Sequence, residues 1–151
     1  MKIELEIRTG EEMRLTACRR QVMTLFSSNP RIGFSEHEIR CMLDNHFDRT
    51  TIFRTVKKLY QHGFIHDAFR EGTTRKYALT EKSNKEGHGH FHCKECGRIF
   101  CMEGALTVTI PLANLQIDTV RVLLEGKCSL RNCNPNTRSS KRKTDLNDQA
   151  T

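Results

Sequence analysis

Two pairs of cysteines in the C-terminal half of the chain constrain its fold more than any other feature. Cys93 and Cys96 form a Cys-x-x-Cys motif that Gly97 follows directly, and Cys128 and Cys133 form a second pair about thirty residues later. Four thiolates fill the tetrahedral coordination shell of zinc and leave no open position for a substrate. The paired spacing therefore predicts a closed, structural zinc site, and the alternative is four unrelated buried thiols.

The cysteine content also bears on where such a chain works. The chain has 151 residues and seven cysteines, and its N-terminus lacks the pattern of a signal peptide. No apolar run approaches the length of a membrane span. We therefore expect a cytoplasmic protein with no membrane partner, whose thiols are reduced and serve metal binding. Of the cysteines outside the two pairs, Cys18 and Cys41 are expected to be small core residues on helices, and Cys101 is assigned no role.

The charge of the chain indicates a partner. The net charge is +7 and the isoelectric point is about 9.2, with the basic excess in the N-terminal half and the C-terminal tail. An excess of this size is typical of proteins that bind nucleic acid, and a solvated basic surface is the alternative.

The N-terminal half has the signals of three helices within residues 16–62, followed by two short strands. Thr16 and Asp48 are placed as N-caps, Ser35 and Glu38 form a capping box, and Gly63 ends the third helix. The segment 27–34, "SSNPRIGF", is predicted as a break between the first two helices. The runs "GFIHDAF" and "RKYALT" are predicted as a hairpin joined by "REGTT". Three helices followed by a hairpin make a winged helix, whose third helix enters the major groove of DNA.

The third predicted helix has two different faces. Ile52, Val56, Leu59 and Tyr60 fall within one arc and are predicted to face the core. The opposite face offers hydroxyls, a guanidinium and ammonium groups but no carboxylate; it comprises Thr50, Thr51, Arg54, Thr55, Lys57 and Lys58. Such a face can contact phosphates and base edges together, although a solvated helix face is the alternative.

The histidines that precede the first cysteine pair indicate a second metal site. If residues 88–93 form a strand that pairs with residues 98–101, then His88, His90 and His92 share one face and Cys93 lies on the other. The histidine cluster is therefore predicted to be separate from the four cysteines. Imidazoles suit zinc, iron, manganese or nickel, and a polar strand end with solvated histidines is the alternative.

The order of these parts resembles the ferric uptake regulator family of bacterial metalloregulators. The matching motifs are "LTACRR", "DRTTIFRTVKKLYQHGFI", "HGHFHCKECG" and "GKCSLRNC", which together span about residues 14–133. The resemblance implies a homodimeric DNA-binding repressor of the α+β class, with a winged helix and a small α/β dimerisation domain. The expected divisions are a DNA-binding domain (1–80), a hinge (81–87), a zinc-containing dimerisation domain (88–133) and a disordered basic tail (134–151).

The resemblance also assigns roles to particular residues. It implies a structural zinc on the four paired cysteines and a regulatory metal between the domains, for which His88 and His90 match the usual His-x-His. It places DNA contacts on Thr51, Phe53 and Arg54, and Arg19 matches the family's arginine in the first helix. Further ligands of the regulatory metal are expected from the DNA-binding half, with His37, His66 and Asp67 as candidates.

Several positions depart from the family pattern. Phe53 stands where a tyrosine is usual, Ala78 stands where an acidic residue often ends the second hairpin strand, and a frequent histidine aligns near Gly33. The amphipathic helix that the family usually has between its last strands is expected to be short or absent in residues 103–115. The identity of the regulatory metal therefore stays open between Zn²⁺ and Fe²⁺.

The function expected from these features is that of a metal-responsive transcriptional repressor that binds a double-stranded DNA operator and controls metal homeostasis genes. A winged-helix protein with only a structural zinc, and a peroxide sensor with iron at the histidines, are the alternatives. An enzyme is not expected. A zinc hydrolase or deaminase needs an open coordination position beside a carboxylate, and the chain has neither an H-x-E nor a P-C-x-x-C motif.

Overall fold

The computed structural model describes residues 14–80, 88–103, 114, 116–118, 120–131 and 133, and the structural statements below concern these residues. The predicted hinge (81–87), the predicted disordered tail (134–151) and most of the segment 103–115 lie outside them. Within the described part of the chain, no helix combines the length and the apolar character needed to cross a membrane.

Three helices form the N-terminal part of the structure: α1 (Ala17–Ser28), α2 (Glu36–Met42) and α3 (Arg49–Gln61). Each begins at the N-cap that the sequence predicts, because a side-chain oxygen accepts a hydrogen bond from a free N–H of the first turn. Thr16 caps α1, Ser35 and Glu38 form the capping box of α2, and Asp48 caps α3. Gly63, with a φ of 72°, follows the end of α3.

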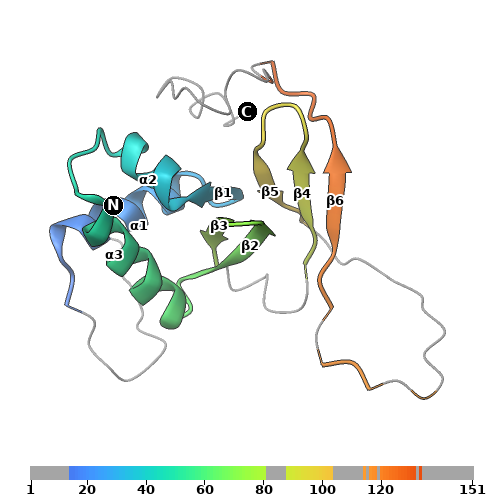
Figure 1. Ribbon diagram of the computed structural model, residues 1–151, viewed down its shortest axis with the longest axis horizontal. Helices are drawn as coiled ribbons and strands as arrows, with labels where there is room; N and C mark the ends of the chain where they lie inside the picture. The colour runs from blue at the N-terminus through green and yellow to red at the C-terminus, as the bar shows by residue number, and fades with distance from the viewer. Residues whose placement is uncertain are drawn as a thin grey trace.

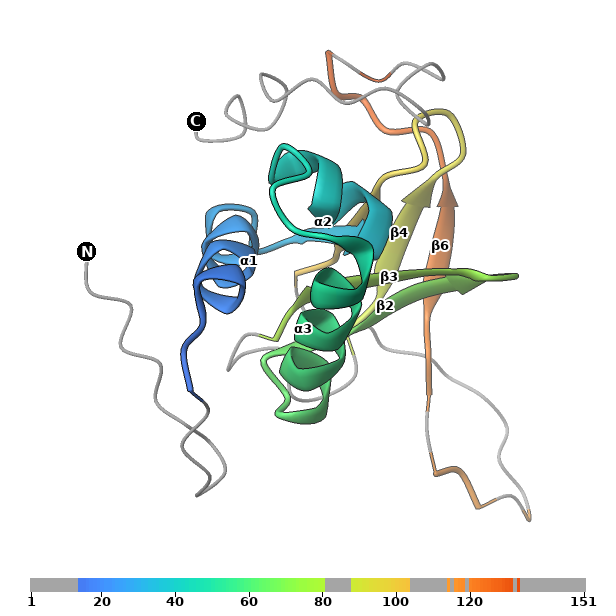
Figure 2. The same cartoon turned by 60° about the vertical axis from the view of Figure 1, so that its left-hand side comes forward.

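Six strands form one sheet in the order β2-β3-β1-β5-β4-β6. The strands are β1 (Ile32–Ser35), β2 (Ile65–Glu71), β3 (Thr74–Leu79), β4 (His90–Cys93), β5 (Ile99–Cys101) and β6 (Leu123–Gly126). All neighbours pair antiparallel except β4 and β6, which are parallel. The helices gather at one end of the molecule and β4 to β6 lie at the other, with the β2–β3 hairpin between them (Figures 1 and 2).

The strand β1 is the main difference from the sequence prediction, which placed only a break in this segment. Within the sheet β1 pairs with β3 of the N-terminal half on one edge and with β5 of the C-terminal half on the other. It therefore joins the two halves through main-chain hydrogen bonds. Gly33 permits this approach, because a Cβ at that position would lie 3.2 Å from the Cβ of Ile99. A four-residue strand buried on both faces shows no alternation, so periodicity could not reveal it.

The core of the N-terminal half contains the apolar face of α3, with two corrections to the prediction. Ile52, Val56 and Leu59 are buried as predicted, but Tyr60 is 40% exposed and Thr55, predicted on the outer face, is buried. Thr55 lies three residues after Ile52 and four before Leu59, so it completes the stripe at positions i, i+3, i+4 and i+7. Its hydroxyl donates to the sulfur of Cys18 at 3.4 Å, which makes its burial tolerable.

Other predictions on this part of the chain have mixed outcomes. Cys18 is buried as expected, whereas Cys41 is only half-buried. The hairpin β4–β5 around the first cysteine pair and the hairpin β2–β3 are both present. Of the strand expected over 115–126, the structure has β6 at its C-terminal end.

Candidate metal centres and basic surface

The structure brings the four paired cysteines together at one end of the β4–β6 pair. All four sulfurs lie within 4.8 Å of one another, with Cys93 and Cys133 at 3.6 Å and Cys96 and Cys128 at 3.8 Å. The parallel pairing of β4 with β6 sets Cys93 opposite Gly126, so that Cys128 follows just beyond. The turn from Cys93 to Gly97 closes with a hydrogen bond from the Gly97 N–H to the Cys93 carbonyl at 2.8 Å.

The electrostatics of this cluster suit a cation. Burial alone would raise the pKa of the Cys93 thiol, but the backbone N–H groups of Cys96 and Cys128 stabilise its thiolate and bring the pKa to about 6. The pKa of the Cys133 thiol is raised to about 12, mainly by the neighbouring thiol of Cys128 and then by burial and the thiols of Cys93 and Cys96. Several thiolates so close together repel one another unless a positive ion lies among them. The donor chemistry therefore fits zinc, which binds four thiolates in closed structural sites.

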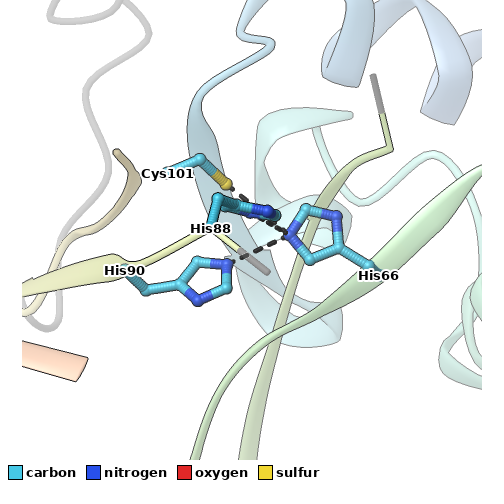
Figure 3. Close-up of side chains that lie close together, drawn as sticks. All are labelled: His66, His88, His90 and Cys101. Carbon is cyan, nitrogen blue, oxygen red and sulfur yellow. Dashed lines mark hydrogen bonds between the residues drawn. The ribbon is translucent and has the colours of Figure 1, made fainter. Parts of the chain in front are cut away.

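A second cluster of potential ligands lies where the two halves of the chain meet (Figure 3). It consists of His66, His88, His90 and Cys101, whose ligand atoms all lie within 4.8 Å of one another. The Nε2 atom of His66 is 3.1 Å from Nε2 of His88, 3.1 Å from Nε2 of His90 and 3.6 Å from the sulfur of Cys101. As predicted, this cluster is separate from the four cysteines.

Strand pairing explains the convergence. His90 and Cys101 are direct partners across β4 and β5, and His88 lies two residues before His90. His66 comes from β2 in the other half, where its partner across the hairpin is Ala78. Ala78 is the position where the family resemblance expects an acidic residue. The His66 imidazole on β2 therefore lies next to the position on β3 where the family often has a carboxylate.

The cluster differs from the predicted set of regulatory ligands. His66 joins His88 and His90 as expected, but Asp67 and His37 do not. The Asp67 carboxylate forms an ion pair with Arg75 at 2.9 Å, and His37 lies on α2 with its Nε2 3.8 Å from the sulfur of Cys41. His92 is also elsewhere: its Nδ1 is 3.1 Å from a carboxylate oxygen of Glu125.

Cys101 is the candidate ligand that sequence reasoning missed. A signal was present, because antiparallel pairing around the Cys93–Cys96 turn places residue 101 opposite residue 90. A cysteine outside the paired spacing nevertheless carries no ligand signature of its own.

Two histidines of this cluster, His66 and His90, are held neutral. Burial first, and then the neighbouring histidines, lower the pKa of His66 to about 4; burial and His88 lower the pKa of His90 to about 4 as well. Near pH 7 both rings therefore keep a lone pair that a metal ion can use. A cavity of about 570 Å³, lined by these histidines together with Val120 and Leu123, gives access to the cluster.

The residues predicted to bind DNA lie mainly on the outer face of α3. The exposed members are Thr50, Phe53, Arg54, Lys57 and Lys58. Thr51 is half-buried and its hydroxyl donates to the Asp48 carboxylate, while the Arg19 guanidinium donates to the carbonyl of Arg14. Thr55 does not belong to this face.

A basic cavity adjoins this face and was not found from the sequence. It has a volume of about 520 Å³ and lies between α2, the start of α3 and the turn of the β2–β3 hairpin. Its cationic lining residues are Arg40, Arg49 and Arg75, of which Arg75 is bound to Asp67. Arginines from three separate elements leave no periodic signal, so only the fold brings them together.

Comparisons with protein-family models and with solved structures point to the same family. The family model of the ferric uptake regulator family matches residues 10–109. No match to a curated protein sequence was found.

Among solved structures, the ferric uptake regulator of Vibrio cholerae is 17% identical, with 77% of this chain and 92% of that chain covered and a TM-score of 0.57. The ferric uptake regulator of Francisella tularensis, determined with iron, is 16% identical, with 80% and 96% covered and a TM-score of 0.58. A zinc uptake regulator in complex with zinc and DNA is 20% identical, with 78% and 82% covered and a TM-score of 0.51. At these identities the likeness concerns the fold.

Proposed function

The chain belongs to the ferric uptake regulator family, whose members are transcriptional regulators rather than enzymes, and from this premise we propose that it is a cytoplasmic, homodimeric repressor. In this proposal it binds operator DNA when a metal ion occupies the second cluster, which consists of His66, His88, His90 and Cys101. The observation that carries the proposal is the convergence of donors from both halves of the chain on one point.

The DNA-binding part of the proposal assigns a winged helix to α1–α3 and the β2–β3 hairpin. Arg54 is placed in the major groove, where a guanidinium can form paired hydrogen bonds with a guanine. Lys57, Lys58 and Arg49 are placed at phosphates, because they are exposed cations around the same face. The zinc uptake regulator solved with DNA supports this assignment through its shared fold.

The donor set of the second cluster favours zinc over iron(II) or manganese(II). Three imidazoles and one thiol are the ligands that tetrahedral zinc accepts, whereas manganese and other hard ions prefer carboxylate oxygen. Among the residues that the structure describes, no carboxylate belongs to the cluster. When bound, a zinc ion supplies no redox chemistry and holds its ligands at fixed separations. A peroxide sensor would need iron at these histidines, so the same donors argue against that alternative.

The two clusters receive different roles. Cys93, Cys96, Cys128 and Cys133 would hold a permanent zinc that maintains the C-terminal fold. His66, by contrast, belongs to the β2–β3 hairpin, while its three partners belong to the C-terminal half. Shared ligation would fix the position of the hairpin relative to that half. If these residues bind zinc more tightly in the arrangement that fits DNA, zinc binding would shift the population toward that arrangement.

The homodimer is supported by the edge of the sheet. β6 ends the strand order, and Leu123 and Leu124 on it are 46% and 41% exposed in the described part of the chain. Exposed apolar residues on a terminal strand are typical of surfaces that another chain covers.

The test of the function is the affinity for DNA with and without metal. The probe is a duplex selected from random-sequence DNA by binding to the zinc-loaded wild-type protein, called below the selected duplex. Added zinc should raise the affinity of the wild-type protein on the order of tens of times, within the usual range of allosteric coupling, and iron(II) and manganese(II) should do so less effectively. The His88→Ala/His90→Ala protein should keep its four-cysteine zinc and its fold but lose this gain.

Two outcomes would reject parts of the proposal. An equal gain in the wild-type and double-variant proteins would show that these histidines are not the sensor. DNA binding by the wild-type protein that no added metal changes would favour the alternative with a structural zinc alone.

A further inference from the structure

Lys76 is a buried lysine that neither metal cluster nor the basic surface uses. It lies on β3 with only 8% of its surface exposed. Its ammonium group donates to a carboxylate oxygen of Glu38 at 2.8 Å and to the carbonyl oxygen of Gly97 at 2.8 Å. A buried ammonium is costly unless its partners are in place, so this position depends on both of them.

The two partners belong to opposite halves of the chain. Gly97 closes the turn that carries Cys93 and Cys96: it has a φ of 71°, and its N–H donates to the Cys93 carbonyl. An ion held by both cysteines would restrain the conformation of this turn. Lys76 contacts the turn at the residue directly after the second ligand.

Glu38 is the third residue of α2 and completes its capping box with the N-cap Ser35. One of its carboxylate oxygens accepts from the N–H of Ser35 at 2.7 Å, and its own N–H donates to the Ser35 hydroxyl at 3.2 Å. Burial would raise the pKa of Glu38, but the charge and hydrogen bond of Lys76 and the bonds with Ser35 hold it below its usual value. The carboxylate thus stays ionised and accepts hydrogen bonds from the Ser35 N–H and from the Lys76 ammonium at the same time.

The link also borders a cavity, although Lys76 itself is buried. A cavity of about 620 Å³ lies among α2, the hairpin and the cysteine turn, and Glu38, Lys76 and Gly97 line it. Because the Lys76 ammonium is buried, its charged hydrogen bonds are stronger than the same bonds would be in water.

We propose that Lys76 is a positioning residue that couples the four-cysteine site to the start of α2. Zinc at the cysteines would then stabilise the helices that face DNA as well as the C-terminal fold. The inference rests on the proposed zinc at the four cysteines, but it does not require DNA binding. Coupling is reciprocal, so a change at α2 must alter how firmly the cysteines hold zinc.

The test is the rate at which zinc leaves the four-cysteine site for a metallochromic chelator, measured as the slower phase after zinc at the second cluster has been removed. Lys76→Met should accelerate this phase on the order of ten times, within the usual range of coupling between sites. Glu38→Gln, which keeps a capping side chain and removes the charge, should also accelerate it although Glu38 contacts no cysteine. The combined variant should release zinc no faster than Lys76→Met alone, because both changes break one link.

A control and a second readout separate coupling from a general loss of stability. Lys94→Met removes a lysine of the same turn whose ion pair with Glu125 is exposed, and it should leave the rate unchanged. Amide exchange at Glu38 should be faster in the zinc-loaded Lys76→Met protein than in the wild-type protein. If Lys76→Met does not fold, the test is the comparison of the zinc release rates of Glu38→Gln and Lys94→Met.

The role of Lys76 would be overturned if Lys76→Met or Glu38→Gln released zinc at the wild-type rate. It would also be overturned if the combined variant released zinc faster than either single variant, by the product of their two accelerations. A wild-type protein that contains no zinc at the cysteines would instead contradict the proposed structural site, and the inference with it.

Discussion

Replacing Cys96 by serine should leave a protein that has about one zinc ion fewer per chain and cannot maintain its C-terminal fold. Cys96 is 4% exposed and its sulfur lies 3.8 Å from that of Cys128, so its replacement leaves only three of the four clustered thiols. Zinc at a closed site of this kind contributes on the order of 10 kcal/mol to folding, which is comparable to the whole free energy of unfolding of a small domain. Cys128→Ser should behave in the same way.

Zinc content and oligomeric state measured on the purified protein check this prediction. Both variants should aggregate or run as monomers in gel filtration. Cys41→Ser is the matched control, since Cys41 lies on α2 outside both clusters and should keep the zinc content and state of the wild-type protein. A Cys96→Ser protein that is folded and carries the wild-type amount of zinc would show that the four-cysteine site is wrong.

Replacing Arg54 by alanine should weaken binding to the selected duplex by roughly ten to a hundred times, because one bidentate contact with a base contributes about 1–3 kcal/mol. Arg54 is exposed on α3, so its removal leaves the core intact. Lys58→Ala should differ in kind: as a phosphate contact it should weaken binding to all sequences about equally. It should also reduce the slope of log affinity against log salt by about one unit.

Titrations with the selected duplex and with unrelated DNA at several salt concentrations distinguish these two effects. Arg131→Ala removes an exposed arginine of the C-terminal half and should leave both affinities nearly unchanged. Normal binding of the selected duplex by a folded Arg54→Ala protein would contradict the placement of α3 in the major groove.

The features predicted correctly from the sequence are those with local or short-range causes. The caps at Thr16, Ser35 and Asp48 depend on hydrogen bonds within one helical turn, and a polar side chain before an apolar periodic run reveals them. The four-cysteine cluster was predictable because a zinc ion needs its ligands in pairs on tight turns, and that need leaves a fixed spacing in the sequence.

The features that were missed depend on tertiary pairing. β1 is a strand because β3 and β5 flank it, not because its own four residues favour one. Thr55 is buried because α1 supplies the sulfur of Cys18 as a partner, which no helix-face count includes. Cys101 becomes a neighbour of the histidines only once β5 pairs with β4. His66 was among the predicted candidates, but only the fold shows that His66, and neither Asp67 nor His37, reaches the same point. A site built across two halves leaves no contiguous motif.

The measurement that tests the central claim most directly is the zinc-dependent gain in affinity for the selected duplex in a His66→Ala protein. His66 lies outside the His-x-His motif and in the opposite half of the chain from His88, His90 and Cys101. If the proposed switch is a metal shared between the halves, His66→Ala should keep its four-cysteine zinc and its zinc-free affinity but lose most of the gain that zinc produces in the wild-type protein. A His66→Ala protein whose affinity rises with zinc as much as that of the wild-type protein would contradict the claim that ligation across the two halves controls DNA binding.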